Sequence, residues 1–292
     1  MRISYSMMYD QSEYNINKQY EEYFKLNEKV STGKEVNRPS DDPIAMGKIL
    51  GYRSTISALD QYKTNIERGD TWLGFTEGAL DQSEKLMVNA RTLAISMDGD
   101  NVDQFPIIAA QVEQIAEQLL QIANSSVSGK YLFSGHKTET IPFTMDENLN
   151  VTYHGDNNKI KYSVDQTTDV EVNITGQETF IEGTNAFDAL KHLHQALSDD
   201  DVLEVGVALG DLNASIEQIV KQWSLTGTLR QQLDSSDEQI EQFKFLTEDL
   251  LVDTENTDMV KRLTDLTARE IAFSAALQTT GMIRNLTLLN YI

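Results

Sequence analysis

The fold is decided by residues 52–94, which read YRSTISALDQYKTNIERGDTWLGFTEGALDQSEKLMVNARTLA. Every seventh residue of this stretch is apolar or aromatic, namely Tyr52, Leu59, Ile66, Leu73, Leu80, Met87 and Ala94. No proline interrupts the 62 residues between Pro43 and Pro106, and proline is the residue that helix interiors tolerate least. The pattern predicts one helix from about residue 44 to about residue 97, roughly 80 Å long at 1.5 Å per residue.

The other heptad position that a two-stranded coiled coil would fill with apolar residues is charged here. The residues at this position are Lys63, Asp70, Glu77, Glu84 and Arg91. A charged column is unfavourable in a simple two-stranded zipper, because both core positions of a zipper are buried. We therefore interpret the helix as one long rod in a small bundle.

Two later stretches have the same helical period. The first stripe is Ile108, Val112, Ile115, Leu119 and Ile122. We expect this helix to begin with Asp103 as its cap and Pro106 in its first turn, and to end near Gly129. The second stripe is Val202, Val205, Leu209, Leu212, Ile216, Ile219 and Trp223, and it continues less regularly to Leu250. Three long stripes indicate antiparallel rods that pack lengthwise.

Both ends of the chain also carry apolar helical faces. The first face is Tyr5, Tyr9, Ile16, Tyr23, Leu26 and Val30. The last face is Met259, Leu263, Leu266, Phe273 and Leu277, continued by Ile283, Leu286 and Leu289. These helices either pack on the same body as the rods or need a partner outside it. The second alternative is favoured, because chain ends are usually polar and frayed.

The hydrophobic period drops to two between residues 131 and 183. Ile160, Tyr162 and Val164 alternate with polar residues, as do Val170, Val172 and Ile174. Turn residues separate these runs. The pattern predicts a small antiparallel β-domain inserted between helices, and we expect it to project from the helical body. Removal of 146–180 is then expected to leave the rods stable.

The composition excludes several classes of function. The 292 residues include 46 acidic and 24 basic side chains, which gives a formal charge of −22. That charge argues against nucleic acid and against anionic membranes as partners. The absence of Cys excludes disulfides and thiol nucleophiles. No apolar run approaches the length of a membrane span, and the first residues lack the apolar core of a signal peptide.

No arrangement of residues indicates catalysis, a cofactor or a metal. His192 and His194 are two residues apart on an expected helix, so they point in different directions and make a poor metal pair. The acidic run 98–103 lacks the spacing of a calcium loop. The run 199–201 reads as the solvated first turn of a helix. We predict that the chain is not an enzyme.

Three segments are more specific than any periodicity. They are LNEKVSTGKEVNRPSDDP at 26–43, GKYLFSG at 129–135 followed by Pro142-Phe143, and LTLLNYI at 286–292. Together they resemble the bacterial flagellin superfamily, and within it the proteins of the hook–filament junction. The resemblance covers about 1–143 and 205–292. Glu35 departs from it, because a basic residue is usual there, and Ile292 stands where Leu is common.

The resemblance implies a mainly α fold: long antiparallel helical rods, terminal coiled-coil helices and a small inserted antiparallel β-domain. The implied domains are 1–43 with 256–292 as the terminal assembly core, 44–135 with 184–255 as the rod, and 136–183 as the surface-projecting β-domain. It also implies unfolded export without a cleaved signal peptide. The implied role is a structural adaptor outside the cell, between hook and filament. A flagellin filament subunit is the alternative, and a coiled-coil adhesin is a more distant one.

The implied partners are hook-associated protein 1 on the hook side, flagellin on the filament side, identical subunits in a ring and a flagellar export chaperone. Neither nucleic acid nor a membrane is among them. We expect the terminal helices to form the assembly interface by folding as they dock. The residues predicted for it are Ile3, Tyr9, Ile16, Tyr23, Leu263, Leu266, Phe273, Leu277, Leu286 and Leu289.

Overall fold

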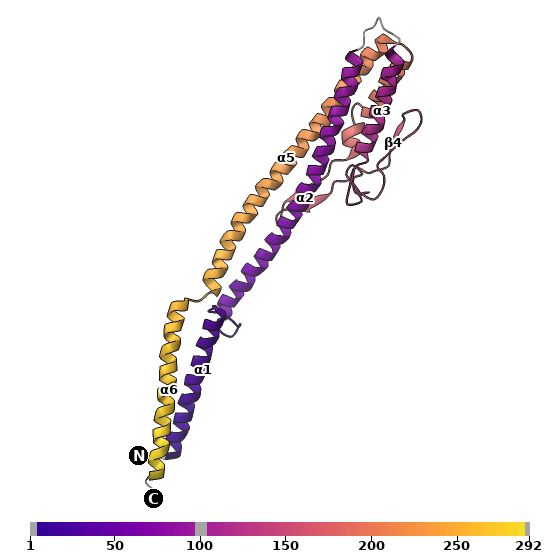
Figure 1. Ribbon diagram of the computed structural model, residues 1–292. Helices are drawn as coiled ribbons and strands as arrows, with labels where there is room; N and C mark the ends of the chain where they lie inside the picture. The colour runs from indigo at the N-terminus through magenta and orange to yellow at the C-terminus, as the bar shows by residue number, and fades with distance from the viewer. Residues whose placement is uncertain (1–4, 97–103, 290–292) are drawn as a thin grey trace. The chain divides into compact units, whose positions relative to one another are not determined.

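A computed structural model describes residues 5–96 and 104–289 of the chain (Figure 1). The helices are α1 Tyr5–Thr32, α2 Pro43–Ile95, α3 Phe105–Ala123, α4 Ala186–Ser198, α5 Val202–Glu255 and α6 Met259–Leu289. The strands are β1 Ser126–Val127, β2 Lys130–Tyr131, β3 Phe143–Met145, β4 Val151–Tyr153, β5 Lys161–Ser163 and β6 Asp169–Glu171, and a π-helical turn spans Gln177–Ile181. The predicted mainly α fold class is confirmed.

The chain divides into two compact units. The first unit combines the residues up to Ala58 with those from Phe243 onward, and the second is Leu59–Gln242. Helices α2 and α5 each contribute to both units. This division does not follow the domain boundaries expected from the sequence, which remain a prediction. No described helix contains a stretch apolar enough to span a membrane.

The heptad stripe of α2 forms the core of the second unit. Its members from Leu59 to Ala94 are all at most 8% exposed. Leu80, Met87 and Ala94 pack with the apolar face of α3 and with the first half of α5, from Val205 to Ile219. Leu59, Ile66 and Leu73 form a second cluster with Leu233 and Ile240 of α5 and with Val164 and Val170 of the β segment. The rods predicted from the sequence are therefore present, and the periodicity did select the buried residues.

The charged column of α2 pairs with α5. Lys63 lies 2.5 Å from Glu241, and Arg91 donates to Asn213 at 3.2 Å. Arg230 lies between Asp70 at 2.7 Å and Glu77 at 2.6 Å. As residue numbers rise on α2 they fall on α5, so the two rods are antiparallel. Four of the five members of the column that is unfavourable in a zipper thus have a polar partner on α5.

The end of α3 differs from the sequence prediction. The helix ends at Ala123, six residues before Gly129. Asn124 follows it and makes two hydrogen bonds with the backbone of Phe143, donating at 2.9 Å and accepting at 2.9 Å. Gly129 instead forms the β1–β2 turn with a φ of +78°. Pro106 lies in the first turn as expected, and the expected cap Asp103 lies outside the described residues.

The segment between α3 and α4 contains three two-stranded antiparallel ribbons. Phe143 pairs with Tyr153 across β3–β4, and Lys161 pairs with Glu171 across β5–β6. The β5–β6 ribbon is the hairpin predicted from the alternating residues. Strands this short are marginal alone, so packing against the helices must hold them in place.

An aromatic cluster supplies that packing. It consists of Phe133, Phe143, Phe180 and Phe187, each at most 1% exposed. The ring of Phe180 meets that of Phe133 edge-on at 5.3 Å and that of Phe143 edge-on at 5.7 Å. These residues belong to the same core as α2, α3 and α5. The expectation that 146–180 can be removed without loss of stability remains a prediction, and the burial of Phe180 in this core argues against it.

Candidate interaction site on the terminal helices

Helices α1 and α6 pack against each other in antiparallel orientation, and we call them the terminal pair. The ring of Phe273 lies 5.9 Å from that of Tyr20 and 6.4 Å from that of Tyr23. Arg269 forms an ion pair with Glu22 at 2.7 Å. The seam between the helices therefore combines aromatic rings with opposite charges.

The structure brings together about half of the predicted interface residues. Ile16, Tyr23, Leu266 and Phe273 are half-buried in the terminal pair. Tyr9, Leu263 and Leu277 remain 43%, 48% and 46% exposed. Ile3 lies outside the described residues, and Leu286 and Leu289 belong to a part of α6 for which only the backbone is described.

Sequence reasoning missed a second set of apolar residues on the same helices. Exposed members on α1 are Met7, Met8, Tyr14, Tyr20 and Phe24, and on α6 they are Val260, Ile271 and Met282. They lie outside the single stripe that the periodicity selected. Contiguous exposed apolar side chains mark interaction surfaces, so the terminal pair has apolar surface left after its own seam is closed.

The segment that follows α1 and the segment that precedes α6 lie side by side in antiparallel orientation. Glu35 donates its backbone N–H to the carbonyl of Glu255 at 2.7 Å, and Thr257 donates to the carbonyl of Gly33 at 3.0 Å. Lys34 and Asn256 form an antiparallel bridge. Gly33 has a φ of +70°, a left-handed conformation that lets the chain turn out of α1. We call residues 33–35 and 255–257 the crossover.

Two carboxylates of the crossover are each held by two cations. Glu35 lies 2.7 Å from Lys29 and 2.8 Å from Arg262, and accepts from the Thr257 hydroxyl at 2.6 Å. Burial by itself raises the pKa of Glu35. The hydrogen bonds from Lys29 and Thr257 and the charges of Lys29 and Arg262 outweigh burial, so the pKa lies below the usual 4.5. Glu35 is therefore ionised at neutral pH.

The second carboxylate, Glu255, is more buried. Its side chain is 8% exposed and contacts the ammonium of Lys34 and, at 2.8 Å, the guanidinium of Arg53. Burial raises the pKa of Glu255. The hydrogen bonds and charges of these two partners more than offset this effect, so the pKa lies below the usual 4.5. A buried carboxylate is tolerated only when it is paired in this way.

A groove of about 770 Å³ runs between α1, the loop after it and α6. Charged residues dominate its lining, including Lys25, Glu28, Asp41, Asp265 and Arg269. Small-molecule sites are mostly apolar with few polar groups. The groove is thus better suited to a polar protein surface than to a cofactor.

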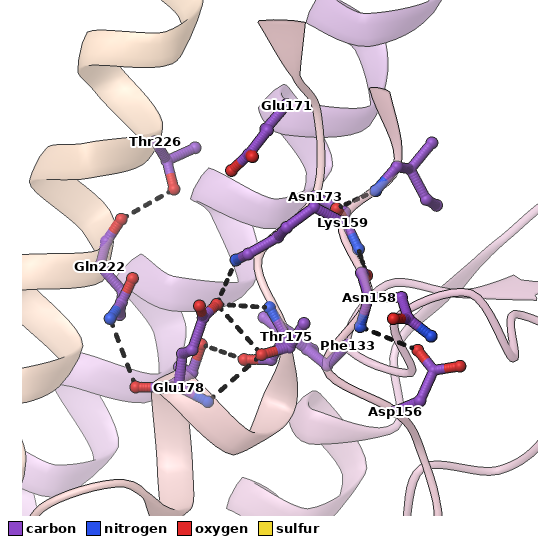
Figure 2. A network of polar contacts seen from close by, with 12 residues as sticks. Phe133, Asp156, Asn158, Lys159, Glu171, Asn173, Thr175, Glu178, Gln222 and Thr226 are labelled. Atoms are coloured by element: carbon purple, nitrogen blue, oxygen red, sulfur yellow. Dashed lines mark hydrogen bonds and ion pairs between the residues drawn. The ribbon is translucent and has the colours of Figure 1, made fainter. Parts of the chain in front are cut away.

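A second polar network lies in the Leu59–Gln242 unit and is centred on Glu178 (Figure 2). Its carboxylate contacts the ammonium of Lys159 and accepts from the Thr175 hydroxyl at 3.0 Å. Gln218 and Gln222 of α5 donate to its backbone carbonyl. Burial raises the pKa of Glu178, and the contacts with Lys159 and Thr175 more than offset this and lower it. The network joins the β segment to α5, and Gln222 Oε1 is a buried acceptor in it without a hydrogen-bond donor among the described residues.

His192 joins α4 to α5 without forming a metal site. Its two ring nitrogens lie 3.0 Å from Asp211 and 3.2 Å from Glu204. Within the described parts of the chain, no group of three or more His, Cys, Asp and Glu side chains is placed to hold a metal ion. His192 thus bridges α4 and α5 through contacts with two carboxylates.

That bridge should weaken as pH rises. The hydrogen bond with Asp211 raises the pKa of His192 above 6.5; burial opposes this, and Glu204 adds to it. A raised pKa means that the stabilisation is complete below about pH 6.5 and is lost as pH rises through the folded-state pKa. The difference in melting temperature between the chain and its His192→Gln variant should therefore be largest near pH 6 and decrease towards pH 9. A difference that grows with pH would contradict the bridge.

Comparison with known proteins agrees with this architecture. The family model "Bacterial flagellin N-terminal helical region" matches residues 3–138. Flagellar hook-associated protein 3 of Salmonella typhimurium is 31% identical over 183 residues, or 62% of this chain. The match spans 57% of that relative's length.

Two solved structures have the same fold. A candidate flagellar hook-associated protein of Vibrio parahaemolyticus gives a TM-score of 0.66 at 21% identity, over 74% of this chain and all of that one. Flagellar hook-associated protein 3 of Legionella pneumophila gives 0.62 at 14% identity, over 70% of this chain and 98% of that one. The resemblance that the three sequence segments indicated is therefore confirmed: the chain is similar to bacterial flagellins and flagellar hook-associated proteins in sequence, and to the latter in fold.

Proposed function

We propose that the chain is a structural junction protein of the bacterial flagellum that adapts the hook to the flagellin filament. It would contact hook-associated protein 1 on one side, flagellin on the other and identical subunits in a ring. It would act outside the cell after export without a cleaved signal peptide, with a flagellar export chaperone as an earlier partner. The role is structural and involves no catalysis.

One observation carries the proposal: the side of α6 that faces away from α1 is exposed and free of charge. We call it the outer face, and it consists of Val260, Leu263, Thr264, Thr267, Ile271, Ser274, Ala275, Gln278 and Met282. At 100° per residue it covers roughly 120° of the helix circumference. In a chain with 24% charged residues, such a surface fits burial against another protein.

The distribution of charge supports assembly through the same region. Residues 1–43 and 256–292 contain 11 acidic and 10 basic side chains, a formal charge of −1. Residues 44–255 contain 35 acidic and 14 basic side chains and carry the remaining −21. Like-charged copies repel one another wherever their acidic surfaces approach. Close packing of copies is therefore least costly at the terminal pair.

The proposed mechanism is folding coupled to docking. Helices with little tertiary packing are marginal in water, and many residues of the terminal pair lie on its exposed side. Docking buries these side chains, and each Leu, Ile or Phe that becomes fully buried contributes roughly 1.5–3 kcal/mol. A terminal pair that is loosely ordered in the free chain would then become ordered only at a growing tip.

Substitution of the outer face tests the function directly. Ile271 is 65% exposed, so Ile271→Asp should leave the terminal pair and the Leu59–Gln242 unit unchanged. We expect it to reduce incorporation at the hook tip at least tenfold, because a buried unpaired carboxylate costs several kcal/mol. Incorporation is measured by complementation of motility and by labelling of the isolated hooks.

Glu270→Gln is the matched control, since residue 270 neighbours the outer face but does not belong to it. Normal incorporation of Ile271→Asp would contradict the proposal. Hydrogen exchange on the free chain tests the coupled folding: 5–32 and 259–289 should exchange much faster than the core of α2. Long homopolymers of the purified chain would instead favour a filament subunit.

A further inference from the structure

The apolar seam of the terminal pair permits more than one alignment of its helices. On α1 the half-buried Ile16, Tyr23 and Val30 are seven residues apart, and on α6 Met259, Leu266 and Phe273 are also seven apart. A shift of α6 by seven residues, about 10 Å along the axis, places apolar residues opposite apolar residues again. The hydrophobic pattern alone therefore does not select the observed alignment.

Chain connectivity limits the shift but does not by itself select the observed alignment. Only Asn256, Thr257 and Asp258 separate α5 from α6. Fully extended, this connection spans at most about 14 Å, so a shift of about 10 Å would use most of its length. Charge alone does not exclude the shift, because Glu22 and Glu28 of α1 and Glu35 just after it recur every six or seven residues. Some more specific contact must distinguish the alignments.

The contact between Glu35 and Arg262 has that specificity. Arg262 donates Nη2–H to Oε1 of Glu35 at 2.8 Å and Nε–H to Oε2 at 3.0 Å, so both carboxylate oxygens are engaged. Such two-point geometry is far more demanding than a single ion pair. The Thr257 hydroxyl donates to the same Oε2 at 2.6 Å. The crossover holds Glu35 itself in place through its backbone bond to Glu255.

The alternative carboxylate is already occupied. Glu28, the next acidic residue towards the start of α1, pairs with Arg38 of the following loop at 2.8 Å. In a shifted alignment Arg262 would have to displace Arg38 and would lose Thr257 as a neighbour. Polar contacts at a few positions are known to select the register of coiled helices whose apolar residues are compatible with several.

We propose that Glu35 is a register-setting residue: its two-point contact with Arg262, held by the crossover, selects one alignment of α6 on α1 and excludes the seven-residue shift. The inference deepens the proposed function, because the alignment determines which residues the terminal pair presents for assembly. It also gives a role to the one residue in the first quoted segment that departs from the family pattern.

The absence of Cys makes the alignment measurable. Spin labels on Asn27→Cys and Gln278→Cys lie at exposed sites that are not level with each other. A seven-residue shift therefore changes their distance by several ångströms in double electron–electron resonance. The measurement uses the full free chain in trimethylamine N-oxide, an osmolyte that favours buried surfaces. We expect one dominant distance in the otherwise unchanged chain.

Glu35→Gln should add a second, displaced distance in at least about one chain in ten. Arg262→Gln should do the same, and the double variant should be no worse than either single one, because the two residues act as a unit. Glu28→Gln is the matched control: its carboxylate is also ion-paired and its side chain is 28% exposed against 33% for Glu35. It should keep the single distance.

The proposal would be overturned by an unchanged distance in Glu35→Gln, by an equal effect of Glu28→Gln, or by the lack of a dominant distance in the otherwise unchanged chain under osmolyte. Complete separation of α6 in Glu35→Gln would also overturn it, since the residue would then anchor the helix and not align it. None of these readouts involves a hook or a filament, so they are independent of the outcome for Ile271→Asp.

Discussion

Replacing Phe180 by Ala is expected to lower the free energy of unfolding of the Leu59–Gln242 unit by about 3–5 kcal/mol. Phe180 is fully buried, and its ring contacts those of Phe133, Phe143 and Phe187. Its removal leaves a cavity where the β segment meets the helical core. For a unit of this size the melting temperature should fall by roughly 6–20 °C.

Phe75→Ala is the matched control for this substitution. Phe75 lies on α2 in the same unit but is 51% exposed, so the same chemical change should cost less than about 0.5 kcal/mol. Thermal and urea unfolding followed by circular dichroism measure both variants. Equal, small effects would mean that the β segment contributes little to the core, as a freely projecting domain would.

Replacing Phe273 by Asp is expected to separate α6 from α1. Phe273 is the residue whose ring contacts both Tyr20 and Tyr23, and the substitution places a carboxylate near Glu22 as well. Loss of one apolar contact of this size costs about 2 kcal/mol. This cost lowers the equilibrium constant for pairing of α6 with α1 by a factor of about 30. Hydrogen exchange under osmolyte should show rapid exchange over 259–289, and incorporation at the hook tip should be lost.

Phe245→Asp serves as the control, because Phe245 lies on α5 in the same unit and is 70% exposed. It should leave exchange over 259–289 unchanged. Protection of α6 in Phe273→Asp equal to that in the control would contradict the seam. Since Ile271→Asp should keep this protection, the pair of variants separates pairing within the chain from docking between chains.

The long rods were predictable because the residues that determine each helix are close to one another in the sequence. A seven-residue period over 52–94 selects the buried face of α2, and helical backbone satisfies its own hydrogen bonds wherever it lies. The end of α3 was not predictable in this way. Asn124 ends the helix through hydrogen bonds with Phe143, nineteen residues later, and no local pattern reveals such a contact.

The candidate site was predictable in part for the same reason. Tyr23 and Phe273 lie on apolar stripes, and the structure brings them together. The outer face of α6 was missed because its signal is the absence of charge over several turns, not the presence of apolar residues at one spacing. The role of Glu35 depends on Arg262 and Thr257, more than 220 positions away, so its charge could be noticed but not interpreted.

The antiparallel pairing of α1 with α6 has a consequence for the order in which the seam can form. Residues 259–289 are synthesised after residues 5–32, so the seam cannot close until α6 has been made. A chain that stops after α5 keeps α2, α3 and α5 but lacks the outer face and Arg262, the partner of Glu35. Under the proposed function, a truncated chain of this kind would not dock, so the pairing would act as proofreading for chains that include α6.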